Sequence, residues 1–336
     1  MVQRPENFSV HGAGSWGTAL ALQLARNGVD VRLWGHRPER LEQYNQARRN
    51  TDYLPDTPFP DTLHCHADLQ VLVEHSLYQL IVVPSHGFRQ LLEKLQPLLS
   101  SKHKVLWASK GLELETGRLL HELVEESLPQ IKHYGLVSGP TFAAEVAKGL
   151  PTAMTVASND KLLGEQVSAA FQSQHYRVYT SDDIVGVELG GAVKNVLAIA
   201  AGIADGLGLG ANARTALITR GLAEILRLGR AMGAQAETLM GLSGIGDLIL
   251  TCTDDQSRNR RLGLALGKGK TLIQAIEEIG QAVEGVKTSQ NIHLLATRAG
   301  VEMPICSTVQ QILYHDLPPQ EAVQVLINRT PKPEFY

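Results

Sequence analysis

The sequence predicts an α/β N-terminal domain with a doubly wound sheet, followed by an all-α C-terminal domain. At 336 residues the chain is long enough for two domains and a large core. Apolar strand-like runs alternate with helical periods up to about residue 183. Beyond that point only helical periods follow, separated by glycine and proline. We therefore expect the first domain over residues 1–183 and the second over residues 184–336.

The first domain begins with a strand, a glycine turn and a helix. Residues 8–11 form a short apolar strand, the motif GAGSWG follows at residues 12–17, and helical spacing continues over residues 18–27. A second strand at residues 30–34 completes the unit. A G-x-G-x-x-G motif in this context is the dinucleotide-binding fingerprint of a Rossmann-like fold, in which the glycines let a pyrophosphate approach the helix N-terminus. This turn is therefore a candidate cofactor site.

The residues after the second strand bear on the choice of cofactor. An NAD-selective site usually places an acid here to accept hydrogen bonds from the ribose 2′-OH, and none is present after Trp34. Gly35 would leave space, and Arg37 offers a fork of donors that suits a 2′-phosphate. The sequence thus predicts that NADP(H) is accepted and preferred over NAD(H). The alternative is that Arg37 is a solvated surface charge.

Further strands are expected at residues 80–83, 104–108, 134–138, 152–158 and 176–180, in a sheet of about eight strands. Ligands of doubly wound sheets bind beyond the carboxyl ends of the strands, and Lys110 lies just after such an end. Glu113 and Glu115 follow closely, so a surface ion pair is the alternative for this lysine. Thr141 precedes a short helical segment and is predicted to be its N-cap.

A single cation, Lys194, lies in the interior of a long apolar helix predicted over residues 187–205. Apolar residues cover every side of this helix, which is typical of a buried helix. Gly190 and Gly191 precede the lysine, and their missing side chains would leave room for a small molecule. Lys194 is therefore a candidate catalytic group. The alternative is a lysine that extends to the surface.

Two segments of the second half could handle anions. A glycine-rich turn at residues 241–246 delivers Asp247, which either caps the apolar run that follows or faces Lys194 and keeps it charged. Ser257 is expected to cap a helix over residues 258–266, where the first N–H groups and Arg258 could hold a phosphate dianion. The arginines of this segment could instead be solvated.

Composition excludes several classes of protein. The net charge of −3 provides no overall basic field for nucleic acid. No signal sequence and no uninterrupted run of about 18 apolar residues is present, so we expect no membrane insertion. Three cysteines without close spacing favour a reducing, cytoplasmic location. No metal site is expected either, because the His-Cys-His run at residues 64–66 has no evident partner pair.

Together these motifs resemble the bacterial NAD(P)-dependent glycerol-3-phosphate dehydrogenases. GAGSWGTALA, SKGLE, SGPTFAAEVAKGLPTA, ELGGAVKN, GLSGIGDL, SRN and VEG occur in the order of that family between residues 12 and 285. The resemblance implies a homodimer that interconverts dihydroxyacetone phosphate and sn-glycerol 3-phosphate with NADP(H) or NAD(H). It also implies that the product supplies phospholipid synthesis.

The resemblance also implies the site residues. Lys194 would be the proton acceptor in glycerol phosphate oxidation, and Lys110 would be the second catalytic lysine. The implied substrate-binding residues are Lys110, Gly139, Thr141, Lys194, Asp247, Ser257, Arg258 and Asn259. The implied cofactor-binding residues are Gly12, Gly14, Ser15, Trp16, Gly17, His36, Arg37, Lys110, Ala143, Arg258, Ala282 and Glu284. Two positions depart from the family pattern: Ala282 replaces an expected valine, and His11 ends a strand that is usually aliphatic.

Ketone reduction of this kind needs a hydride on carbon and a proton on oxygen. The nicotinamide cofactor would supply the hydride, and Lys194 would supply the proton while Lys110 polarises the carbonyl. Burial and repulsion between the two lysines would lower the pKa of Lys194 toward the working pH. One alternative is a β-hydroxyacid dehydrogenase of the same two-domain plan. Another is a non-catalytic redox sensor that binds NADPH and a partner protein.

Overall fold

The computed structural model describes residues 2–331 and 333–334. The chain divides into a first unit, which runs up to Gly191 and includes Ala234–Asp247, and a second unit, which holds Ala192–Gly233 and the chain from Leu248 onward. Helix α8 (Ile184–Gly206) begins in the first unit and ends in the second. The division into a cofactor-binding domain that ends at residue 183 and a substrate-binding domain that follows it stays a prediction.

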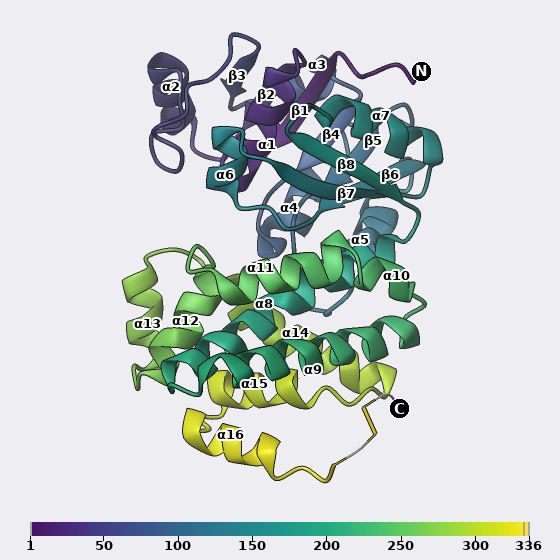
Figure 1. Ribbon diagram of the computed structural model, residues 1–336. Coiled ribbons are helices and arrows are strands. Elements are labelled where there is room, and N and C mark those ends of the chain that lie inside the picture. The colour runs from purple at the N-terminus through teal and green to yellow at the C-terminus, as the bar shows by residue number, and fades with distance from the viewer. Residues whose placement is uncertain (1, 332, 335–336) are drawn as a thin grey trace. The chain divides into compact units, whose positions relative to one another are not determined.

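One sheet organises the first unit, with its strands in the order β3-β2-β1-β4-β5-β6-β7-β8 (Figure 1). The strands are β1 (Asn7–His11), β2 (Asp30–Trp34), β3 (Leu63–His66), β4 (Tyr78–Ile81), β5 (Lys104–Trp107), β6 (His133–Ser138), β7 (Thr152–Ser158) and β8 (Tyr176–Ser181). All neighbours pair in parallel except β6 and β7. The strand order reverses between β1 and β4, which is where ligands bind in doubly wound sheets. The predicted fold class is confirmed for this half.

Helices cover both faces of this sheet. On β5, Leu106 belongs to one apolar cluster, whereas Val105 and Trp107 belong to another. Successive side chains of a strand point to opposite faces, so the two clusters lie on opposite sides of the sheet. The helices of this unit are α1 (Ser15–Arg26), α2 (Pro38–Ala47), α3 (Leu69–His75), α4 (Ser85–Leu95), α5 (Leu120–Ser127), α6 (Ala143–Lys148), α7 (Lys161–Phe171) and α10 (Ala236–Leu239). A short π-helix, Leu242–Gly246, follows α10.

The second unit is helical, as predicted. It contains the rest of α8 together with α9 (Gly210–Ala231), α11 (Asp247–Thr253), α12 (Arg258–Gly267), α13 (Leu272–Ile279), α14 (Glu284–Ala299), α15 (Pro304–Tyr314) and α16 (Pro319–Ile327). Asp247 itself, the first residue of α11, belongs to the first unit.

Helices α8 and α12 approach each other closely because glycines line their contact. A Cβ atom on Gly202 would lie 2.1 Å from the carbonyl oxygen of Arg260, and one on Gly263 would lie 2.0 Å from that of Ile199. Both distances are far below van der Waals contact, so only glycine fits at these two positions. The close approach brings the first turn of α12 beside α8.

Helix α8 is also the one helix among the described residues that is long and apolar enough to cross a membrane. Of its most apolar window, 94% is buried inside the protein. A buried core helix of a globular protein passes the same test, so this property alone is weak evidence for a membrane span.

Candidate active site

The three glycines of the turn after β1 differ in their surroundings. Gly12 has φ +136, and a Cβ there would lie 2.3 Å from the carbonyl oxygen of Val82. A Cβ on Gly17 would lie 1.8 Å from the carbonyl oxygen of Gly12. A Cβ on Gly14 would meet nothing within 4 Å. The first and third glycines are therefore needed for packing, whereas Gly14 faces open space at the N-terminus of α1.

This open space fits the pyrophosphate of a dinucleotide. No side chain caps the N-terminus of α1, so its first N–H groups are available to an anion. The indole Nε1 of Trp16, in the first turn, is buried and has no hydrogen-bond partner among the described residues. Ser15 is the first residue of the helix. The residues of the predicted fingerprint thus leave both room and donors for a cofactor.

A buried asparagine that sequence analysis missed holds this turn in place. The side-chain amide of Asn50 donates to the carbonyl oxygen of Ala13 at 3.0 Å and to the hydroxyl of Thr18 at 2.8 Å. Its side-chain oxygen accepts from the backbone N–H groups of Asp52 and Tyr53. The loop before β3 therefore supports the glycine turn, and only the fold reveals this link.

Beyond β2 the structure corrects one part of the cofactor argument, the space at Gly35, and leaves the roles of His36 and Arg37 as predictions. His36 and Arg37 are both exposed just after the carboxyl end of β2, where a ribose phosphate could reach them. The space beside Gly35 is filled by the protein, since a Cβ there would lie 3.1 Å from Ala13 Cβ and from Leu41 Cδ2. Gly35 is thus needed for packing and does not leave room for a phosphate.

Lys110 lies beyond the carboxyl end of β5 and pairs with a buried carboxylate. Its Nζ donates to Asp247 Oδ2 at 2.8 Å and to the carbonyl oxygen of Gly139 at 3.4 Å. The Lys110 side chain is 15% exposed and that of Asp247 only 1%. Glu113 forms its ion pair with Arg89 instead. The alternative of a surface ion pair with Glu113 or Glu115 is therefore wrong, because Lys110 pairs with the buried Asp247.

The turn after β6 brings Gly139 to Lys110, and Thr141 lies in the same turn. Gly139 has φ +154, and a Cβ there would lie 2.9 Å from the Cα of Met154. The hydroxyl of Thr141 donates to the carbonyl oxygen of Gly139 at 3.2 Å. The prediction that Thr141 caps the next helix is wrong, because Phe142 is the N-cap of α6. The threonine hydroxyl is used to shape the turn instead. Ala143 is the first residue of α6 and is half-buried.

The space left by Gly190 is filled by the protein, whereas Gly191 lies beside two side chains. A Cβ on Gly190 would lie 2.4 Å from the carbonyl oxygen of Ser243 in the π-helix, and one on Gly191 would lie 3.3 Å from Ser138 Oγ. The expectation that these glycines leave room for a small molecule is therefore wrong for Gly190, which lets the π-helix pack against α8. For Gly191 it stays a prediction, because the atoms nearest to its Cβ position are side-chain atoms of Ser138 and Lys110. Ser138 Oγ is buried without a hydrogen-bond partner among the described residues.

In the second unit, Lys194 is buried and bound to a hydroxyl that sequence analysis missed. The residue is 6% exposed, so the alternative of a lysine extending to the surface is wrong. Its Nζ donates to Thr251 Oγ1 on α11 at 3.1 Å. A threonine in an apolar helical segment carries no sequence signal of this role.

The first turn of α12 is joined to α8 and α14 by a chain of amides. Asn259 Nδ2 donates to Asn195 Oδ1 at 2.9 Å, and Asn259 Oδ1 accepts from the N–H of Gly285 at 3.0 Å. Asn195, next to Lys194, was also missed. The predicted N-cap is confirmed, because Ser257 accepts from the N–H of Arg260 at 3.2 Å. Asn259 is thus fixed beside α8.

The arginines of this segment have different roles. Arg258 is half-buried and its Nη1 donates to the carbonyl oxygen of Ala282 at 2.9 Å. Arg260 is buried and pairs with Asp205 at 2.5 Å, so the alternative of a solvated side chain is wrong for it. Arg261 is exposed. Arg258 is therefore the arginine placed at the N-terminus of α12, where anions are favoured. Glu284 is the first residue of α14 and is half-buried.

Each unit, taken by itself, presents groups that suit negative charge. The first unit offers Lys110, which Asp247 orients, and the second unit offers a buried ammonium on Lys194 and a helix N-terminus with Arg258. Among the described residues, no group of three or more His, Cys, Asp or Glu side chains could hold a metal ion. The donors present favour an oxyanion or a phosphate.

Comparisons with known proteins agree over most of the chain. Residues 7–163 match the family model of the NAD-dependent glycerol-3-phosphate dehydrogenase N-terminus, and residues 183–324 match that of its C-terminus. A glycerol-3-phosphate dehydrogenase [NAD(P)+] of Thioalkalivibrio sulfidiphilus is 56% identical over 97% of this chain and 98% of its own. The corresponding protein of Halorhodospira halophila is 54% identical over 98% of both chains. A crystal structure of glycerol-3-phosphate dehydrogenase from Coxiella burnetii, 48% identical, aligns with a TM-score of 0.93 over 97% of this chain and 99% of that one.

Proposed function

The chain belongs to the NAD-dependent glycerol-3-phosphate dehydrogenase family, and we propose on that premise that it interconverts dihydroxyacetone phosphate and sn-glycerol 3-phosphate with NAD(P)(H). It is an oxidoreductase that uses a nicotinamide cofactor. The observation that carries the assignment of chemistry is a lysine in each unit that is bound to a polar partner: Lys110, 15% exposed, to Asp247 and the buried Lys194 to Thr251. Cations held in this way are what a reaction that develops negative charge on oxygen requires.

The glycine turn and α1 would hold the cofactor. The N–H groups of α1 bind the pyrophosphate beside Gly14, with Ser15 and Trp16 in the first turn. His36 and Arg37 bind the ribose phosphate of NADP(H), and the lack of an acid there favours NADP(H) over NAD(H). When bound, the reduced nicotinamide supplies the hydride. The predicted contacts of Ala143, Ala282 and Glu284 with the cofactor stay predictions.

The two lysines would handle the carbonyl oxygen. In reduction, Lys194 donates its proton to the oxygen as the alcohol forms, and in oxidation it accepts that proton. Lys110 polarises the carbonyl through hydrogen bonding and charge, while Asp247 keeps its ammonium oriented. Gly139 and Thr141 shape the turn against which Lys110 lies.

The first turn of α12 would bind the phosphate of the substrate. Arg258 offers a bidentate fork, and the helix N-terminus capped by Ser257 favours the anion. Asn259 adds an amide that is already held by Asn195 and Gly285. Positioning of this kind is worth up to about 7 to 11 kcal/mol of the barrier in well-oriented reactions. We further propose a cytoplasmic homodimer whose product supplies phospholipid synthesis.

The decisive experiment measures loss of NADPH absorbance on addition of dihydroxyacetone phosphate, with NADH in a parallel assay. Dihydroxyacetone without its phosphate is the control and should react poorly, because positioning by α12 is then lost. Lys194→Ala should abolish turnover while NADPH still binds, as measured by fluorescence titration. Activity with 3-hydroxy acids and none with dihydroxyacetone phosphate would overturn the proposal. Light scattering tests the dimer.

A further inference from the structure

The loop that follows Lys110 is built around a buried glutamate. Glu113 lies three residues after the lysine, and its side chain is 5% exposed. Its carboxylate accepts hydrogen bonds from Arg89 Nε and from the hydroxyl of Thr116. Its backbone N–H donates to the carbonyl oxygen of Arg118 at 3.0 Å, and its carbonyl oxygen accepts from the N–H of Gly117 at 3.0 Å. The backbone and the side chain of Glu113 thus hold the loop over residues 113–118 together.

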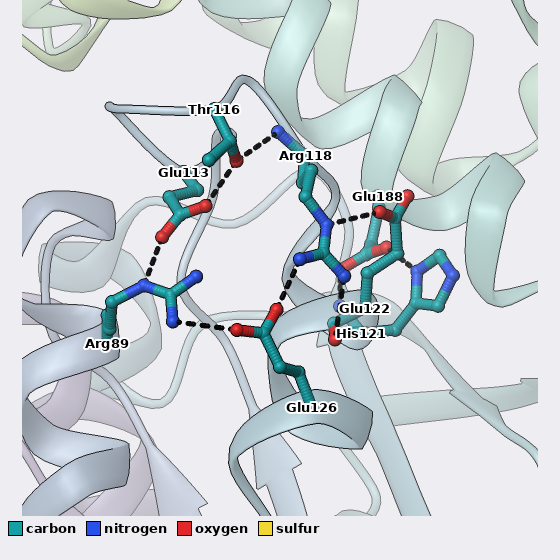
Figure 2. A network of polar contacts seen from close by, with 8 residues as sticks. All are labelled: Arg89, Glu113, Thr116, Arg118, His121, Glu122, Glu126 and Glu188. Carbon is teal, nitrogen blue, oxygen red and sulfur yellow. Dashed lines mark hydrogen bonds and ion pairs between the residues drawn. The ribbon is translucent and has the colours of Figure 1, made fainter.

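This loop is joined to two helices by charged side chains (Figure 2). Arg89 on α4 binds both Glu113 and Glu126, the latter at 3.3 Å. Arg118, at the end of the loop, binds Glu122 at 2.8 Å and also Glu126 on α5. All these groups lie in the first unit, as does the ion pair between Lys110 and Asp247. The network therefore fixes the chain on the carboxyl side of Lys110.

The Arg89–Glu113 pair differs from an ordinary surface ion pair. Exposed pairs contribute little, since water solvates both partners and the side chains lose entropy. Here the carboxylate is buried, while Arg89 is 30% exposed. Burial opposes ionisation of Glu113, yet the hydrogen bonds from Arg89 and Thr116 outweigh it and lower the pKa of the carboxyl below its ordinary value. A buried carboxylate of this kind keeps its charge only with its partners in place.

Nothing in the chemistry of ketone reduction assigns a role to this pair, because Glu113 points to Arg89 and Thr116. We propose that Arg89 and Glu113 are positioning residues, which set the place of the Lys110 ammonium by holding the loop that follows it. This inference rests on the proposed function of Lys110. A displacement of about 1 Å in a catalytic group can lower the rate roughly 100-fold, so a pair remote from the chemistry can act through geometry alone.

Glu113→Gln tests this role because it keeps the size of the side chain and removes its charge. We expect kcat for dihydroxyacetone phosphate reduction to fall roughly 10- to 100-fold, with the Kd for NADPH nearly unchanged. Glu122→Gln is the matched control, since it breaks an ion pair of the same network at 2.8 Å without touching Glu113. Its kcat should stay near that of the unmodified protein. Arg89→Lys should retain more activity than Arg89→Met because it keeps the positive charge.

A double-mutant cycle separates positioning from a general structural effect. If Glu113 acts through Lys110, adding Glu113→Gln to Lys110→Ala should lower the residual rate, measured in single turnovers at high enzyme concentration, by less than about twofold. A loss as large as in the unmodified background would overturn the proposal. So would equal rates for Arg89→Lys and Arg89→Met.

Hydrogen exchange provides a readout that does not depend on activity. Glu113→Gln should speed amide exchange in the peptide that covers residues 109–119, whereas Glu122→Gln should not. Unchanged exchange in that peptide would overturn the proposal even if kcat falls. If the unmodified protein failed to reduce dihydroxyacetone phosphate, the proposed function would fail, while faster exchange would still show that Glu113 orders the loop.

Discussion

At the level of single residues, the glycines of the first turn show how one motif combines packing with binding. No side chain fits at Gly12 or Gly17, because a Cβ atom there would lie 2.3 or 1.8 Å from a backbone oxygen. Gly14 has no such neighbour within 4 Å. If a pyrophosphate occupies that space, substitution of Gly14 should harm binding alone, and substitution of Gly17 should harm folding.

Gly14→Ala and Gly17→Ala therefore form a matched pair of variants. We expect Gly14→Ala to melt within about a degree of the unmodified protein while its Kd for NADPH rises at least roughly tenfold, because the new methyl group would occupy the ligand's space. Gly17→Ala should lower the free energy of unfolding by about 1 to 3 kcal/mol through overpacking. Calorimetry and fluorescence titration measure the two effects. Normal NADPH binding by Gly14→Ala would contradict the cofactor site.

Thr251 offers a second test at this scale. Its hydroxyl accepts from Lys194 Nζ at 3.1 Å, so Thr251→Val should leave the ammonium with one acceptor fewer at almost constant volume. Loss of a hydrogen bond to a charged group costs about 1.5 to 3 kcal/mol, which corresponds to a decrease in kcat of about 10- to 100-fold. Thr253→Val, on the same helix at an exposed position, is the control. Steady-state kinetics measure kcat of both variants. An equal kcat for Thr251→Val and Thr253→Val would mean that Thr251 is not part of the site.

The residues that sequence reasoning found and missed differ in a physical way. Lys194 and Asp247 were found because a charge in an apolar or glycine-rich run is costly and needs an explanation. Thr251 and Asn195 were missed because a hydroxyl or amide is unremarkable in a helix until its partner is known. Asn50 was missed for the same reason, since its two acceptors lie more than 30 residues away in the sequence.

At the level of elements, the caps of α12 and α13 allow stability to be separated from binding. Ser257 accepts from the N–H of Arg260 at the start of α12, and Thr271 forms a capping box with Gln274 at the start of α13. Replacing either cap with alanine should cost about 1 kcal/mol of stability. Only Ser257→Ala should also raise the KM for dihydroxyacetone phosphate, because only this cap lies in the proposed phosphate site. A similar KM for both variants would contradict the placement of the phosphate at α12.

The sequence predicted most elements through their periodicity. The strands at residues 30–34 and 152–158 agree with β2 and β7. Strand β4 ends at Ile81, although the apolar run continues to Val83, because the chain turns there to meet Gly12. The end of β4 is therefore set by a contact with a neighbouring segment, which the periodicity of the sequence does not reveal.

Irregular segments were the least predictable. The π-helix Leu242–Gly246 reads as a glycine turn in sequence, yet its backbone is held against Gly190 of α8. Helix α14 begins at Glu284, next to Gly285, whose N–H is bound to Asn259. In both cases a tertiary contact, and not local preference, determines where the element begins.

At the level of the whole molecule, a buried carboxylate couples the stability of the second unit to pH. Glu224 on α9 accepts hydrogen bonds from the N–H groups of Ile305 and Cys306, at 2.6 and 3.1 Å, in the first turn of α15. Burial raises the pKa of Glu224 from 4.5 to about 6, although these two hydrogen bonds favour the charged form. The carboxyl thus joins two helices and also titrates in an accessible range of pH.

The direction of the pH dependence follows from this raised pKa. A carboxyl that binds its proton more tightly in the folded state stabilises the fold fully below its unfolded pKa of 4.5, and this contribution is lost as pH rises through about 6. The rise in pKa corresponds to about 2 kcal/mol, since one pKa unit equals about 1.4 kcal/mol. Glu224→Gln cannot titrate there. The free energy of unfolding of the unmodified protein, minus that of the variant, should therefore fall by about 2 kcal/mol between pH 4.5 and 7.

Urea denaturation of both proteins at several pH values, followed by circular dichroism, measures this difference. Glu321→Gln, at an exposed position of α16, controls for the change in charge and should give a difference that stays nearly constant with pH. If the difference in free energy of unfolding between the unmodified protein and Glu224→Gln did not change with pH, water would reach the Glu224 carboxyl in solution. A difference that grows with pH would mean that the two N–H groups of α15 stabilise the carboxylate more than burial penalises it, because a lowered pKa reverses the sign of the linkage.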